Sequence, residues 1–324
     1  MKVCFLENTE FSYNSKDLYN PKLRGAETVL INLSSSIKQL GHKVTIINNC
    51  PKNENIDGIE WKNINHYDDN ETFELAITNN DIRLFDKITA NKKIAISHSL
   101  QSLEKFIRKK QILSYLKHKP KIVLLSDYHK KNRSKLLTLF GSFRLDWSVN
   151  HLFLEADISH NNNPDRAIFT SKHDRNLDML LNIWTNLIYP KFNSAKLMVP
   201  DNNFNIHHKS IIMRNRGSQK DLIEDLRSSK VFLIPGHKAE LFCLAAEEAK
   251  EMCLPIVTLG IGCLSERVDH GKTGFVAKNQ SEFAKYTIDI FKDNHLYKEL
   301  KQNLIRQRGK NNWNKTAKKL FDLI

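Results

Sequence analysis

The sequence predicts an α/β protein built from two doubly wound domains that face a central cleft. Short continuous apolar runs, typical of parallel strands buried on both faces, recur along the chain. Stretches of helical periodicity separate these runs. A polar stretch rich in Asn at 157–166 interrupts the pattern, which then restarts. With 324 residues, the chain is long enough for two hydrophobic cores.

The first domain, expected over 1–158, begins with a strand at 2–8 and a helix at 26–41 that ends at Gly41. A second strand follows at 42–49. This strand–helix–strand order implies parallel pairing with a right-handed crossover. Three further buried strands are expected at 75–79, 93–97 and 121–126.

The second domain, expected over 159–309, repeats the alternation of strands and helices. Strands are expected at 166–171, 195–200, 209–214, 230–236 and 255–260. Helices are expected at 176–188, 219–229 and 241–252. Ligands of such domains bind beyond the carboxyl ends of the strands.

The composition is that of a globular protein, with 40% apolar and 27% charged residues. No apolar run reaches the roughly 18 residues of a membrane span, and the N-terminus is too short in apolar length for a signal peptide. The five scattered cysteines lack a CxxC spacing, so neither a zinc site nor a disulfide framework is expected. The net charge of +14 favours anionic partners, or reflects base composition alone.

The residues resemble the retaining glycosyltransferases of family 4, which have the two-Rossmann-domain GT-B fold. The resemblance is strongest over 231–277, which is similar to the family's strand, Pro-containing loop, Glu-x7-Glu helix, Leu-Pro strand and Gly-rich turn. The segment 24–47 is similar to the family's N-terminal opening, and 169–184 to its phosphate-binding strand, loop and helix. The C-terminal helix at 310–324 resembles one that joins the first domain.

The resemblance implies that Glu248 accepts hydrogen bonds from the ribose hydroxyls of a nucleotide sugar, since a carboxylate has two acceptor oxygens. Glu240 is expected near the donor sugar, in a catalytic role, and an acid there also caps the helix. Cys243, where the family usually has Gly, and Leu244 are assigned to the same donor site. The alternative for Glu248 is a solvated helix face, as for its neighbour Glu247.

Basic residues at 172–175 are expected to hold the diphosphate. Arg175 stands where the resemblance places a diphosphate-binding Lys, and its guanidinium suits phosphate oxygens. Thr170 stands where a second Arg is usual, and Lys172 is the nearest basic substitute. The alternative for both is a basic surface loop.

Two residues of the first domain complete the predicted site. His98 follows a strand where the family often has a His that faces the donor sugar, so a catalytic role is implied; a structural His is the alternative. Gly25 matches the glycine loop that approaches the phosphates, and Arg24 replaces the first glycine of that pair.

The segment 104–121 is basic, with Phe106, Ile107, Leu113 and Leu116 interleaved. Basic amphipathic helices bind to anionic membrane surfaces. Each Lys or Arg near the surface contributes up to about 1 kcal/mol to the binding free energy. A solvated surface helix is the alternative.

We therefore expect a retaining hexosyltransferase that moves a sugar from a nucleotide-diphosphate sugar to a hydroxyl of a glycan or lipid-linked acceptor. The resemblance implies cell-envelope, polysaccharide or lipopolysaccharide synthesis, with no metal and no further cofactor. We expect a cytoplasmic protein, peripheral on the inner face of the membrane. A nucleotide-sugar epimerase of the same fold is the alternative. A basic nucleic-acid-binding protein is a second, less favoured alternative: the net charge permits it, but no recognised motif is present, so nucleic acid is not expected as a partner.

Overall fold

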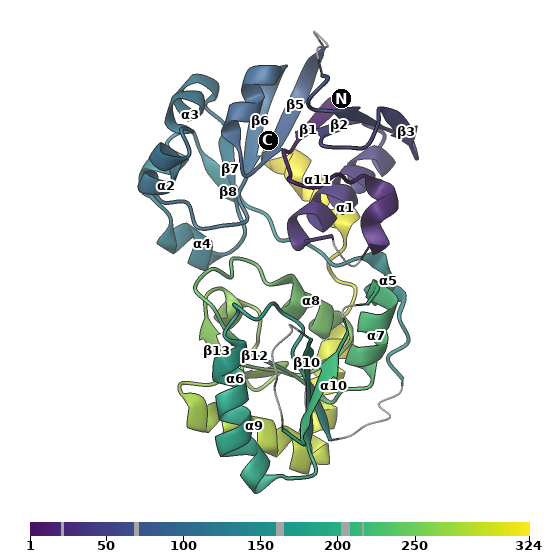
Figure 1. The fold of residues 1–324 in the computed structure, drawn as a ribbon, viewed down its shortest axis with the longest axis vertical. Coiled ribbons are helices and arrows are strands. Elements are labelled where there is room, and N and C mark those ends of the chain that lie inside the picture. The colour runs from purple at the N-terminus through teal and green to yellow at the C-terminus, as the bar shows by residue number, and fades with distance from the viewer. Residues whose placement is uncertain (21–22, 68–70, 160–164, 202–207, 216) are drawn as a thin grey trace. The chain divides into compact units, whose positions relative to one another are not determined.

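The computed structural model, shown in Figure 1, describes residues 1–324 except 21–22, 68–70, 160–164, 202–207 and 216. Part of the predicted linker at 157–166 therefore lies outside the described residues. The chain divides into two compact units, which are treated separately below. The first unit comprises Met1–Trp147 and Asn312–Ile324, and the second unit comprises Ser148–Asn311. This division falls at 147/148, whereas the sequence analysis places it at 158/159.

The first unit contains an eight-stranded sheet in the order β3-β4-β2-β1-β5-β6-β7-β8. Its strands are β1 (Lys2–Leu6), β2 (Lys43–Asn48), β3 (Glu54–Ile56), β4 (Ile59–Asn63), β5 (Thr72–Asn79), β6 (Thr89–Ile96), β7 (Lys121–Leu124) and β8 (Ser142–Arg144). All neighbours pair in parallel except β3 and β4. The parallel strands therefore end at one edge of the sheet, where loops of different sequence position meet.

The first unit contains helices along both parts of its chain. They are η1 (Ser15–Tyr19), α1 (Gly25–Gln39), η2 (Ile82–Lys87), α2 (Leu103–Arg108), α3 (Ile112–His118), α4 (Asp127–Asn132), η3 (Lys135–Thr138) and α11 (Trp313–Leu323). Helix α11 packs against α1 although nearly three hundred residues separate them in sequence. Its residues Trp313, Ala317 and Leu320 are buried at helical spacing.

The second unit contains a six-stranded parallel sheet in the order β11-β10-β9-β12-β13-β14. Its strands are β9 (Arg166–Ile168), β10 (Lys196–Pro200), β11 (Ile211–Arg214), β12 (Val231–Gly236), β13 (Ile256–Ile261) and β14 (Gly274–Val276). Its helices are α5 (His151–Glu155), α6 (Leu177–Ile183), η4 (Trp184–Ile188), η5 (Tyr189–Lys191), α7 (Gln219–Arg227), α8 (Leu244–Glu251), η6 (Leu264–Glu266), α9 (Gln280–Lys292) and α10 (Asn294–Gln307). The predicted α/β class, with two parallel-sheet domains, is confirmed.

The chain passes from one unit to the other at 147/148 and at 311/312. Within each unit, the residues next to these two crossings contact one another. In the first unit, Thr316 Oγ1 donates a hydrogen bond to the Asp146 carbonyl at 3.0 Å, and the rings of Trp147 and Trp313 stack. In the second unit, Ser148 Oγ donates to the Asn311 carbonyl at 3.3 Å. The two ends of each unit are thus tied together by local contacts.

The basic segment 104–121 forms two short helices, α2 and α3, instead of one amphipathic helix. Lys110 separates them with a φ of 55°, the left-handed conformation that ends a helix. Phe106 is buried in the core, whereas Ile107, Leu113 and Leu116 are exposed. Within the described residues, no helix has the length and apolar character to cross a bilayer.

Candidate functional site

Two loops of the second unit meet beyond the carboxyl ends of adjacent strands. The loop 169–176 follows β9, the loop 237–243 follows β12, and these two strands are hydrogen-bonded neighbours. Arg175 Nε lies 2.8 Å from Glu240 Oε1, so an ion pair joins the loops. The Asn176 side chain also donates to the carbonyl of Gly236 at the end of β12. Parallel pairing therefore brings together residues that are 65 positions apart.

Burial raises the pKa of Glu240, with the nearby charge of Arg175 acting against that rise. The Arg175 guanidinium is about one-quarter exposed and also contacts Asp174 Oδ2 at 3.3 Å. A partly exposed guanidinium, fixed by a carboxylate at one edge, keeps further donors for an anionic ligand. Lys172 is exposed in the same loop, and the buried hydroxyl of Thr170 has no hydrogen-bond partner among the described residues.

Cys243 directly precedes α8 and has a φ of 63°, in the left-handed region that favours glycine. Its side chain is buried. Its carbonyl accepts from the amides of Ala246 and Glu247, which starts the helix, and Leu244 is the first helical residue. The backbone conformation explains why a glycine suits this position.

Gly262 is a second constraint on this loop. It has a φ of 77°, and a Cβ atom there would lie 2.4 Å from the His237 carbonyl and 2.9 Å from that of Glu240. The amide of Cys263 donates to the Glu240 carbonyl at 3.1 Å. The turn after β13 therefore supports the backbone of Glu240 at a distance that only glycine permits.

Glu248 and Glu247 differ in their surroundings, although both lie on α8. Glu247 forms ion pairs with Lys250 at 3.1 Å and with Arg267 at 3.5 Å. Glu248 has no side-chain hydrogen bond or ion pair within the part of the chain that the structure describes. Burial raises its pKa to about 7, and the charge of Arg214 opposes the rise. A partly buried carboxylate without a partner is poised to accept hydrogen bonds from a ligand.

His98 and Gly25 lie in the first unit. His98 follows β6, and its amide donates to Asn80 Oδ1 at 3.0 Å. Its Nε2 is buried without a hydrogen-bond partner among the described residues, and burial lowers the pKa of the ring to about 4, so the imidazole is neutral near pH 7. It lines a pocket of about 280 Å³ with Gln101 and Lys105. Gly25 is the exposed first residue of α1.

The structure thus brings Arg175, Glu240 and Cys243 together in the second unit, with Glu248 on the helix that follows. Lys172 shares the loop of Arg175. Sequence reasoning missed the buried Arg267, whose guanidinium lies 4.2 Å from the Phe242 ring centre and beside Glu247. It also missed Glu7 and Glu27 of the first unit, although Glu7 directly follows the first strand.

Comparison with known proteins supports the architecture. Residues 202–307 match a protein-family model described as Glycosyl transferases group 1. No curated protein matches the chain. Solved structures with similar folds are HepE from Anabaena in complex with UDP (TM-score 0.70, 13% identity, 100% of this chain and 99% of that one) and WaaG, a glycosyltransferase involved in lipopolysaccharide biosynthesis (TM-score 0.66, 13% identity, 99% of each chain).

A third similar structure is a TarM variant from S. aureus in complex with Fondaparinux, α-GlcNAc-glycerol and UDP (TM-score 0.59, 15% identity). The alignment covers 77% of this chain and 55% of the TarM chain, so this chain spans about half the length of that protein. At sequence identities this low, the structural similarity shows the fold alone. The chain therefore has the two-domain GT-B fold of these structures, and residues 202–307 of its second half are similar to the glycosyl transferases group 1 model.

Proposed function

We propose that the protein is a retaining glycosyltransferase that transfers a hexose from a nucleotide-diphosphate sugar to a hydroxyl of a glycan or lipid-linked acceptor. The observation that carries this proposal is the arrangement around α8. An unpartnered carboxylate, Glu248, lies on a helix whose preceding loop is joined to a basic loop by the Arg175–Glu240 ion pair. WaaG, which has a similar fold, is involved in lipopolysaccharide biosynthesis, and this supports a role in polysaccharide or cell-envelope synthesis.

In this proposal, Glu248 binds the ribose through its two oxygens, and Arg175 and Lys172 neutralise the diphosphate. Leaving-group charge is then stabilised by fixed positive groups, so no metal is required in the proposed reaction. Glu240 holds Arg175 in place and lies toward the sugar. In the first unit, the neutral ring of His98 is suited to hydrogen bonding with a sugar hydroxyl and does not add positive charge.

The ribose assignment is tested by calorimetry with a panel of nucleoside diphosphates. Glu248→Gln should weaken the tightest of them about tenfold, because hydrogen bonds to a charged group contribute about 1.5–3 kcal/mol. In the wild type, affinity should also fall as the pH drops below about 7, where Glu248 becomes protonated, and this dependence should be absent in the variant.

Glu247→Gln is the matched control, since Gln keeps an acceptor for Lys250 and Arg267. Its affinity should stay close to that of the wild type. Equal affinities for wild type and Glu248→Gln, or no binding of any nucleoside diphosphate, would contradict the proposal. Product analysis without an acceptor separates transfer from epimerisation.

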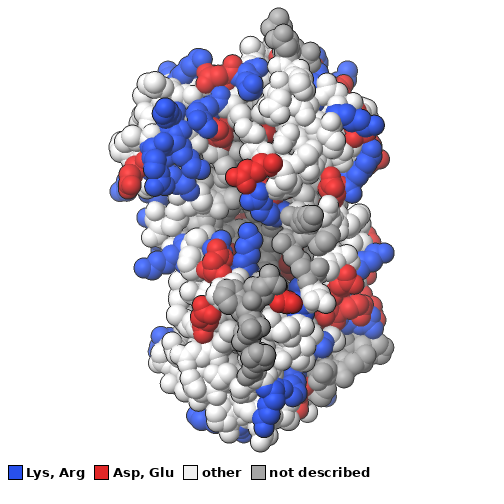
Figure 2. Space-filling model, in the orientation of Figure 1, with Lys and Arg blue, Asp and Glu red and all other residues white. Residues whose placement is uncertain are grey.

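We also propose that the first unit binds an anionic membrane surface from the cytoplasmic side. Five exposed apolar side chains lie on α2, α3 and around η3: Ile107, Leu113, Leu116, Leu136 and Leu139. The Tyr115 hydroxyl donates to the Leu136 carbonyl at 3.3 Å, so α3 and η3 are adjacent. Lys and Arg side chains gather at the left of the first unit, over α2 and α3 (Figure 2). Exposed apolar groups among basic ones suit the boundary between headgroups and acyl chains.

A further inference from the structure

The first unit has a polar pocket of about 610 Å³ beyond the carboxyl ends of β1 and β5. Loops that are far apart in sequence line it, together with the first turn of α1. Its lining includes the buried carboxylates Glu7 and Glu27 and the consecutive basic residues Arg108, Lys109 and Lys110. Acidic and basic groups in one pocket indicate a ligand with two chemically different ends.

The carboxylates form the buried part of the pocket lining. Glu7 is 3% exposed and Glu27 is 4% exposed. Glu7 accepts hydrogen bonds from the Tyr13 hydroxyl and from Asn79 Nδ2. Glu27 Oε1 lies 3.6 Å from Arg24 Nε, but its buried Oε2 has no hydrogen-bond partner within the described chain.

An acceptor atom buried without a donor costs about 1–3 kcal/mol, and more when it is charged. Glu27 lines the pocket, so a ligand bound there is the candidate hydrogen-bond donor to this carboxylate. Four acidic and five basic residues line the pocket, so the charges of its lining are nearly balanced. Neutral hydroxyl groups fit such a lining as donors, because they bring no further charge into it.

The basic residues lie at the end of α2, where the helix dipole favours positive charge. None of the three forms an ion pair among the described residues, and all three are exposed. Lys110 is in the left-handed conformation, with its amide donating to the Ile107 carbonyl at 2.9 Å. The buried Gln111 then donates from Nε2 to the Asn80 carbonyl at 3.1 Å. This bond fixes the basic turn to the loop that follows β5, on the pocket.

We propose that this pocket binds a polyol that carries a phosphate group. Hydroxyls of the ligand donate to Glu27 and Glu7, and the phosphate is held by Arg108, Lys109 and Lys110. Its role as the acceptor rests on the proposed transferase function, whereas binding itself does not. The same chemistry occurs in a soluble sugar phosphate and in the headgroup of a glycerophospholipid, so both sources are tested.

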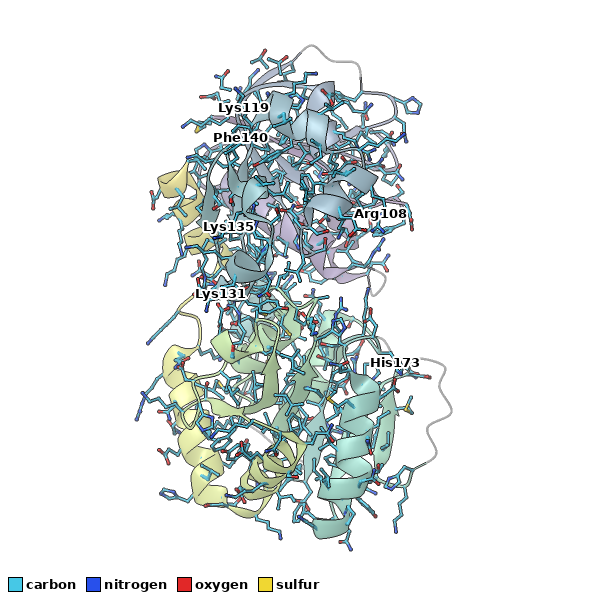
Figure 3. All side chains as sticks on the ribbon, turned by 90° about the vertical axis from the view of Figure 1, so that its left-hand side faces the viewer. Arg108, Lys119, Lys131, Lys135, Phe140 and His173 are labelled. Carbon is cyan, nitrogen blue, oxygen red and sulfur yellow. The ribbon has the colours of Figure 1, made fainter. Side chains whose placement is uncertain are left out.

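The soluble source is tested by titrating the full chain with glucose 6-phosphate, glucose and inorganic phosphate. Glucose 6-phosphate should bind more tightly than either of the others. Glu27→Gln should weaken it about tenfold, through loss of charge-assisted hydrogen bonds. Lys110→Gln should weaken it about threefold, and Lys131→Gln should leave it unchanged. Lys131 is equally exposed on the first unit but does not line the pocket, and Figure 3 shows it well apart from Arg108.

The lipid source is tested with vesicles of phosphatidylglycerol and of phosphatidylserine at equal mole fraction, since only the former headgroup carries free hydroxyls. Weaker binding of Glu27→Gln to phosphatidylglycerol alone would identify a headgroup ligand. Melting temperature and nucleoside-diphosphate affinity, a property of the second unit, show that each variant is folded and keep this test separate from that of the donor site.

Either source supports the proposal. It is overturned if glucose 6-phosphate binds no better than inorganic phosphate and the two kinds of vesicle bind alike. Equal binding of wild type and Glu27→Gln to both kinds of probe would also overturn it.

Discussion

Cys243 shows how a single backbone angle shapes the candidate donor site. The residue has a φ of 63°, where a Cβ atom approaches the following carbonyl and costs about 1–2 kcal/mol. The family resemblance places glycine here, and the structure supplies the physical reason. The departure from glycine therefore places a buried side chain at a backbone angle that favours glycine.

Substitutions at Cys243 should reverse the usual order of alanine and glycine. Cys243→Gly should be more stable than Cys243→Ala by about 1 kcal/mol, because only glycine relieves the left-handed strain. Cys263 is the matched control, since it is also buried but has a φ of −82°. There the alanine variant should be the more stable one by about the same amount. Urea denaturation of the four variants measures both differences, and the same order at both sites would refute the strain argument.

The Glu7 carboxyl makes stability depend on pH. Burial raises its pKa from 4.5 to about 7, so between these values the native state holds a proton that the unfolded state releases. The contribution of Glu7 to the free energy of unfolding therefore falls as the pH rises through this window. Glu7→Gln lacks the effect, so its stability relative to the wild type should increase between about pH 5 and pH 8, by up to roughly 3 kcal/mol. Glu104→Gln, at an exposed site, controls for the lost charge. A difference that is constant with pH would contradict the prediction.

At the scale of elements, the strands that sequence reasoning found are those with continuous apolar runs. It missed β3 and β4, which form a hairpin around Asp57 and Gly58, both with positive φ. It also missed β8 and β14, which are three residues long and lie at sheet edges. A short strand at a sheet edge pairs with one neighbouring strand only. Its sequence therefore need not contain the continuous apolar run by which the central strands are recognised.

Helix α11 should be essential to the first unit. Leu320 is 1% exposed on the face that packs against α1. Leu320→Ala should destabilise this unit by about 2–5 kcal/mol, through lost burial and a residual cavity. Lys319→Ala, on the exposed face of the same helix, should change stability by less than about 0.5 kcal/mol. Denaturation followed by tryptophan fluorescence would compare them, and an effect of Leu320→Ala as small as that expected for Lys319→Ala would contradict the prediction.

At the scale of the whole molecule, the net charge of +14 and the exposed apolar groups of α2, α3 and η3 predict binding to anionic vesicles at low salt. Binding should weaken as ionic strength rises, because salt screens exposed charges. Leu113→Glu should reduce recovery in flotation, since this side chain is 80% exposed, whereas Ile305→Glu on the second unit should not. Equal recovery with neutral and anionic vesicles would contradict the prediction.

The order of strands and helices, their restart in a second half and the loops that carry Arg175 and Glu240 could be predicted from the sequence, because each depends on local pattern or resemblance. The pocket with Glu7, Glu27 and Lys110 could not. Its residues come from three distant segments, and only strand order and the left-handed turn at Lys110 bring them together. The ion pairs of Glu247 with Lys250 and Arg267 are what distinguish it from Glu248, and helical periodicity does not reveal them.

Because the chain crosses between the units twice, the second unit is inserted in the sequence of the first. The second unit is one uninterrupted segment, Ser148–Asn311, whereas the first is assembled from both ends of the chain. The Ser148–Asn311 contact brings the ends of the inserted segment together. A gene fragment that stops at Trp147 would leave α1 without the helix that covers it. The inserted segment can instead be excised as one piece, and its free ends would already lie side by side.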